Sequence, residues 1–122
     1  MRAMILNNPR VLEPGNVDKP ATEDGNALVH IASSGICGTD LEIYSGGIPV
    51  NYPRIMGHEM IGEIAETAAP GVAVGARVIV DPVMACGTCY QCRAGQSNLC
   101  SAGGLIGRDR DGGFADFVSV PA

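Results

Sequence analysis

Short apolar runs separated by glycine, proline and polar residues recur along the chain. Runs of this length between turn-forming residues are typical of β-strands, whose alternate side chains face opposite sides of a sheet. Residues 13–26, with two prolines and two glycines among polar neighbours, are predicted to form a loop. Gly57 and Gly62 lie within one strand-like run and indicate bulges or a close approach of backbones. The predicted strands are residues 1–7, 27–32, 57–64, 75–82 and 113–120.

One short helix is predicted to begin at about Asp40 and to end at a Gly-Gly pair. Thr39 and Glu42 have the spacing of a capping box, in which a hydroxyl and a carboxylate each satisfy a free backbone N–H at a helix start. Cys37 would then lie one turn before the helix, where the positive end of the helix dipole favours a thiolate. A lone cysteine is more often simply buried, so both interpretations stand.

The composition indicates one turn-rich domain. Of the 122 residues 46% are hydrophobic and 17 are glycine, and with two Phe and no Trp the core is expected to be aliphatic. The net charge of −5 leaves no basic stripe to neutralise phosphates, so nucleic-acid binding is not expected. We see no secretory signal or membrane span, and five cysteines favour a reducing cytoplasm. Several short strands with little helix predict a mainly β fold, a small and partly open barrel.

Four of the five cysteines lie within fifteen residues, at positions Cys86, Cys89, Cys92 and Cys100. Gaps of two residues let the chain turn tightly enough to point successive sulfurs at one centre. A fourth thiolate from the far end of the loop completes the closed tetrahedral shell that zinc prefers. The spacing therefore predicts a structural zinc site in a four-cysteine loop.

Other interpretations of this loop remain. The first three cysteines repeat the run of bacterial ferredoxins, but the fourth follows after seven residues rather than three, and Ser101 stands where those proteins have proline. Disulfides are possible in principle, although the cysteines are clustered rather than spread over a framework. Redox chemistry at a Cys-x-x-Cys pair would need a thioredoxin-like strand and helix nearby.

A second candidate site consists of Cys37 and His58 together with Glu59. Each has a bland alternative, but together they could supply two or three ligands of an open zinc site that leaves room for a substrate. Along the chain these residues stand in an ordered series of motifs: Gly-Ile-Cys37-Gly-Thr39-Asp40, Pro-Arg-Ile-Met-Gly57-His58-Glu59-x-x-Gly62, Gly75-x-Arg77-Val78, Cys86 to Cys100 and Gly112-Gly113-Phe114-Ala115. This series resembles the catalytic, GroES-like domain of the zinc-dependent medium-chain alcohol dehydrogenases, nearest the polyol and L-threonine dehydrogenases.

The resemblance implies a role for each residue of the second site. Cys37 and His58 would bind a catalytic zinc, and Glu59 would ligate where other relatives use a cysteine. Asp40 would accept the other ring N–H of His58 and fix its tautomer. Thr39 would pass the alcohol proton onward.

Two positions depart from many relatives. Glu42 stands where these have a histidine that ends the proton relay, so its carboxylate could serve as a base or only cap the helix, and we favour the cap. Gly38 stands where some relatives place a basic residue against the cofactor pyrophosphate.

The implied function is oxidation of a small-molecule secondary alcohol or polyol, as the zinc-bound alkoxide, by hydride transfer to NAD or NADP. No two glycines are two apart, so the G-x-G-x-x-G fingerprint of a Rossmann domain is absent. We therefore expect residues 1–122 to be a truncated GroES-like catalytic domain, inactive without its nucleotide-binding domain and a homo-oligomer when full length. The alternative is a stand-alone structural zinc-binding module without enzymatic activity.

Overall fold

The computed structural model describes all 122 residues, Met1–Ala122. It is mainly β, as predicted, with the expected short helix and a second one in the cysteine loop, and neither helix has the length or the apolar run needed to cross a bilayer. The elements are β1 (Arg2–Asn8), β2 (Val11–Asn16), β3 (Asn26–Gly35), α1 (Gly38–Ser45), β4 (Arg54–Ile55), β5 (Glu59–Thr67), β6 (Arg77–Val80), β7 (Val83–Met84), α2 (Tyr90–Arg93), the 3₁₀ helix η1 (Ser97–Leu99), β8 (Gly104–Leu105) and β9 (Phe117–Pro121).

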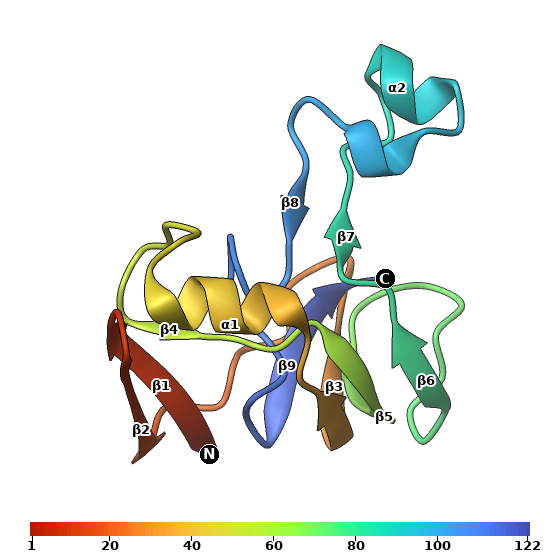
Figure 1. Ribbon diagram of the computed structural model, residues 1–122. Helices are drawn as coiled ribbons and strands as arrows, with labels where there is room; N and C mark the ends of the chain where they lie inside the picture. The colour runs from red at the N-terminus through yellow and green to blue at the C-terminus, as the bar shows by residue number, and fades with distance from the viewer.

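The strands form three antiparallel sheets, ordered β2-β1-β4, β6-β5-β3-β9 and β7-β8. Figure 1 shows the β1–β2 hairpin and the four-stranded sheet on opposite sides of the molecule. The segment before β9 joins the two: the Met4 N–H donates to the carbonyl of Phe114 at 2.8 Å, and the Ile31 N–H donates to the carbonyl of Asp116 at 2.9 Å. Backbone hydrogen bonds to this segment therefore connect the two larger sheets.

The predicted strand boundaries differ from the observed ones by a few residues, and the largest errors concern β2 and β9. Glu13 to Asn16 belong to strand β2 rather than to a loop, because β2 is an edge strand, where a proline need not donate to a ladder. Gly15 fits there because a Cβ would lie 2.6 Å from Cδ1 of Ile5. Strand β9 begins at Phe117 rather than at residue 113, since residues 112–114 instead donate hydrogen bonds to the carbonyls of residues 55–57.

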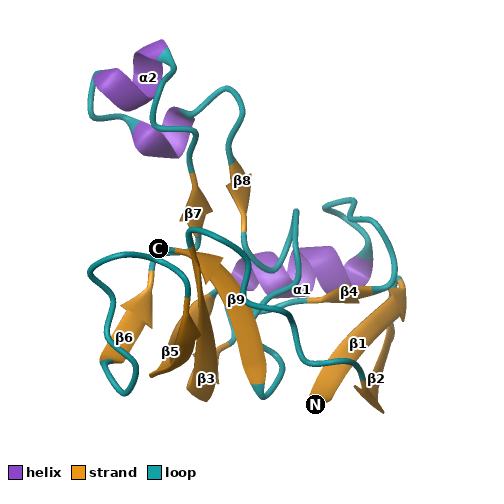
Figure 2. Ribbon diagram, turned by 180° about the vertical axis from the view of Figure 1, so that it is seen from behind, coloured by secondary structure: helices purple, strands orange, loops and turns teal.

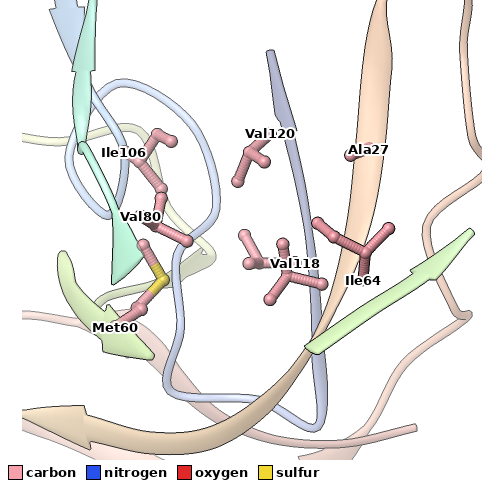
Figure 3. Close-up of a cluster of buried hydrophobic side chains, with 8 residues drawn as sticks. Ala27, Met60, Ile64, Val80, Ile106, Val118 and Val120 are labelled. Atoms are coloured by element: carbon pink, nitrogen blue, oxygen red, sulfur yellow. The ribbon is translucent and has the colours of Figure 1, made fainter. Parts of the chain in front are cut away.

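The core is aliphatic, as predicted, and is built mainly on the four-stranded sheet. Figure 3 shows side chains of β3, β5, β6 and β9 converging on one another. A smaller cluster of Leu6, Ile43 and Met56 seats α1 on the sheet that contains β1 and β4. Burying side chains of this size stabilises the fold by about 1.5–3 kcal/mol each. The main cluster is Ala27, Val29, Met60, Ile64, Val80, Ile106, Val118 and Val120.

Gly62 marks the close backbone approach that the sequence indicated. The register of β3 against β5 shifts between Ile31 and Ser33, opposite Gly62 and Ile61. A Cβ at Gly62 would overlap the carbonyl oxygen of His30 and lie 2.7 Å from Cγ1 of Val29. The bulge is thus packed directly against the glycine.

We expect Gly62→Ala to lower the free energy of unfolding by about 1–3 kcal/mol, because the new methyl group meets backbone that cannot move aside cheaply. Urea denaturation measures the loss. The matched control is Gly38→Ala, where an added Cβ meets nothing within 4 Å. An unchanged midpoint for Gly62→Ala would show that the two strands are not in this contact.

Candidate metal centres

The four cysteines of the loop converge in a lobe that stands away from the sheets, at the end of the β7–β8 ribbon (Figure 2). Their sulfur atoms all lie within 4.8 Å of one another, and no disulfide joins them. The Cys89 Sγ lies 3.5 Å from Cys92 Sγ and 3.9 Å from Cys100 Sγ, and Cys86 Sγ lies 4.0 Å from Cys92 Sγ. Thiolates about 2.3 Å from a tetrahedral zinc stand about 3.8 Å apart, so this group fits a single zinc ion.

Backbone turns, not a core, shape this lobe. Cys89 is the N-cap of the one-turn helix α2, and Gly87 and Gly95 have φ of 72° and 76°, which glycine adopts without strain. The Cys89 N–H points at the sulfur of Cys86 at 3.4 Å. Neither α2 nor η1 contains a buried residue. Because apolar packing is missing, a bound ion is the interaction that the lobe has available to hold its shape.

Hydrogen bonds and burial shift the pKa values of Cys86 and Cys92 in opposite directions. The pKa of Cys86 is lowered to about 6, because the N–H and hydroxyl of Thr88 and the N–H of Cys89 all point at its sulfur. Burial and, to a lesser degree, the neighbouring sulfur of Cys89 together raise the pKa of Cys92 to about 11. A divalent cation among the four sulfurs would favour the thiolate at each of them.

The second group, Cys37, His58 and Glu59, is assembled by the pairing of β3 with β5. Gly35 ends β3 directly opposite Glu59, so the turn into α1 brings Cys37 beside the start of β5. The three ligand atoms lie within 4.8 Å of one another. His58 is buried, whereas Cys37 is half-buried and Glu59 is exposed. One thiol, one imidazole and one carboxylate on a partly open surface form a donor set that suits zinc with a free coordination position.

Asp40 supports this group from within the protein. Its side chain is 2% exposed and accepts hydrogen bonds from the N–H of Cys37 at 2.9 Å and of Gly57 at 3.3 Å. Its Oδ1 lies 3.5 Å from Nδ1 of His58, a buried nitrogen with no hydrogen-bond partner inside the usual range. The carboxylate thus faces Nδ1 and leaves Nε2 of His58 as the nitrogen available to a metal.

The predicted capping box was wrong. Helix α1 begins at Gly38 with Cys37 as its N-cap, and the N3 carboxylate that reaches back to the N-cap N–H belongs to Asp40. Glu42 is exposed, and its backbone carbonyl accepts the N–H of Gly47 at the other end of the helix. Glu42 therefore does not cap the start of α1. The helix does end at the predicted glycine pair.

Thr39 lies beside the same group, with its hydroxyl oxygen 3.8 Å from Sγ of Cys37. Its side chain is half-buried at the first turn of α1. Thr39 and Glu42 are three residues apart, so they share one face of the helix. The Thr39 hydroxyl thus lies beside the second group, whereas Oε2 of Glu42 lies at the other end of the helix, where a Cβ at Gly47 would overlap it.

The second group borders an open hollow with largely apolar walls. Several residues that line this hollow could not be predicted from the sequence, because strand pairing brings them together. Ile61 and Ile79 face each other across β5 and β6, and Ile79 is 84% exposed at the rim. The hollow is lined by Ser33, Gly35, His58, Glu59, Met60, Ile61, Ile79, Val80 and Pro82.

Gly57, which directly precedes His58, has φ of 93°. A Cβ at Gly107 or Gly112 would overlap the backbone of Gly57.

Known proteins are similar to this chain in sequence and fold. Residues 23–122 match the family model of the alcohol dehydrogenase GroES-like domain. A zinc-type alcohol dehydrogenase-like protein of Haemophilus influenzae is 40% identical over all of this chain and 37% of its own length. The L-threonine 3-dehydrogenase of Pyrococcus abyssi is 40% identical over 87% of this chain and 32% of its own length. The alcohol dehydrogenase rspB of Escherichia coli CFT073, solved with NADH, superposes with a TM-score of 0.91 at 38% identity over 100% of this chain and 36% of its own.

The chain spans about a third of the length of these relatives. The predicted mainly β fold, the four-cysteine cluster and the similarity to L-threonine dehydrogenases are all confirmed. The chain belongs to the GroES-like domain family of the zinc-type medium-chain alcohol dehydrogenases.

Proposed function

We propose that this chain is the zinc-holding catalytic domain of a dehydrogenase that oxidises a secondary alcohol or a polyol with NAD or NADP. The observation that supports it is the convergence of Cys37, His58 and Glu59 at an open hollow, with Asp40 behind the imidazole. These residues would hold the catalytic zinc. When bound, zinc polarises an alcohol oxygen and lowers the pKa of its hydroxyl group, and a nicotinamide accepts hydride.

The protein's own part begins with orientation. Asp40 fixes the ring of His58 through Nδ1, and because it also binds the N–H groups of Cys37 and Gly57, one buried carboxylate sets the positions of two ligands. The apolar rim formed by Ile61 and Ile79 favours the carbon skeleton of an alcohol over water. The substrate would enter from this side.

Proton removal is assigned to Thr39 and Glu42. A hydroxyl can accept one proton while it donates another, and Thr39 lies 3.8 Å from the sulfur of Cys37. Glu42, one turn further along α1 and exposed, would take the proton from Thr39 and pass it to water. Glu42 does not cap the start of α1, so rotation of its side chain away from Gly47, against which its carboxylate lies, would bring it towards Thr39 for this task.

The four-cysteine group is assigned a structural zinc. Four sulfurs fill a tetrahedral shell and leave no position for a substrate. Its ion would hold the lobe around α2, which has no buried residues of its own. The two groups therefore divide the work into a closed site that orders a loop and an open site that carries the chemistry.

We expect Cys89→Ser to remove about one tightly bound zinc ion per chain and to expose residues 86–100 to protease, because one ligand of a closed shell is lost. Metal analysis after dialysis and limited proteolysis measure both effects. Cys37→Ser is the matched control, since the same chemical change there leaves the four-cysteine group complete. If Cys89→Ser retained its zinc and its protease resistance, the structural assignment would be wrong.

His58→Ala is expected to abolish binding of a second, weaker ion and to leave the four-cysteine ion in place, because it removes a ligand of the open group only. Cobalt titration of the zinc-loaded chain, followed by visible absorption, measures this. In a full-length dehydrogenase that carries this domain, the same change should abolish alcohol oxidation.

His30→Ala supplies the matched control for His58→Ala, since the other histidine of the chain is exposed on β3 and belongs to neither group. The proposal predicts normal binding of both ions by the His30 variant. A wild-type chain that binds one ion only, even at millimolar cobalt, would instead favour a structural module without catalytic function.

A further inference from the structure

Gly35, the last residue of β3, lies directly opposite Glu59 at the start of β5. The space where its side chain would be is filled by Glu59. A Cβ at this glycine would overlap Oε2 of Glu59 and lie 3.1 Å from its Cβ and 3.5 Å from its Cδ. The carboxylate of Glu59 thus lies folded against the end of β3.

Backbone conformation does not explain this glycine. Gly35 is absent from the positions with positive φ, unlike Gly57 with φ of 93°, so an alanine could adopt its backbone angles without strain. Gly38, the first residue of α1, has open space around it. Gly35 therefore differs from both: it provides room, and Glu59 occupies that room.

Nothing else holds the carboxylate where it lies. The side chain of Glu59 makes no hydrogen bond or salt bridge, although it stands among the ligand atoms of Cys37 and His58. It belongs to the exposed face of β5, which it shares with Ile61 and Glu63, and from there its side chain could equally extend into solvent. Its position beside the other two ligands is set by packing alone.

We propose that Gly35 is a positioning residue for the metal site, because it leaves the space that allows the Glu59 carboxylate to lie beside Cys37 and His58. The inference rests on the proposed function of that group. An alanine at position 35 would keep the fold, since Oε2 lies at the far end of a flexible side chain and the 3.1 Å approach to the Cβ of Glu59 needs only a small shift, but the carboxylate would leave the ligand group. The four-cysteine group, on a separate lobe, would be unaffected.

The experiment is a cobalt titration of the 122-residue chain after zinc has filled the four-cysteine group, with visible absorption as the signal. Gly35→Ala is expected to weaken cobalt binding at the open group about tenfold or more, as the loss of an oriented ligand does, and to change the absorption bands. Its urea midpoint should match that of the wild type. Gly38→Ala, the control glycine with no neighbour within 4 Å, should bind cobalt like the wild type.

A double-mutant cycle with Glu59→Ala separates positioning from a general effect. Once the side chain of Glu59 is gone, adding Gly35→Ala should weaken binding no further, even if Gly35→Ala alone lowers stability. Unchanged or tighter binding by Gly35→Ala would overturn the inference, as would an equal loss in the Glu59→Ala background. If the wild type bound no cobalt at this group, the proposed metal site would fail, and the inference with it.

Discussion

The buried carboxylate of Asp40 is the contact on which the candidate site depends. It joins three parts of the chain: the N–H of Cys37 at the start of α1, the N–H of Gly57 ahead of β5, and the ring of His58. A carboxylate that is 2% exposed is costly to bury unless donors surround it, so these contacts constrain one another. The same residue therefore ties the start of α1 to the segment ahead of β5 and places its carboxylate 3.5 Å from Nδ1 of His58.

The two candidate metal groups rely on different sources of order. The open group is built on the paired strands β3 and β5, next to the main core, so its ligands are placed before any ion binds. The four-cysteine lobe has no core and is held to the rest by the narrow β7–β8 ribbon (Figure 1). We therefore expect metal binding and folding to be coupled in the lobe, and the open group to be largely preorganised.

Local spacing predicted much of this architecture. The intervals between the cysteines predicted the four-cysteine group, and apolar runs between turn residues predicted strands that correspond to β1, β3, β5 and β6. The order of the motifs gave the family. The capping box failed because Asp40 follows Cys37 by three residues, just as Glu42 follows Thr39, and spacing alone cannot choose between the two registers.

Other features depend on contacts between distant segments. Strand β2 carries a Pro-Gly pair that is typical of a turn, and only its place at a sheet edge permits it. The overlap that a side chain at Gly35 would have with Glu59, or at Gly112 with Gly57, follows from the fold and leaves no periodic signal in the sequence. Contacts of this kind arise only between segments that strand pairing brings together, so the sequence alone did not reveal them.

Anomalous diffraction at the zinc edge, from crystals of the chain soaked in zinc, would test directly whether both groups bind metal. We expect two peaks: one among the four loop sulfurs, and one in contact with Sγ of Cys37, Nε2 of His58 and a carboxylate oxygen of Glu59. A single peak in the lobe, with no density between Cys37 and His58 at saturating zinc, would contradict it.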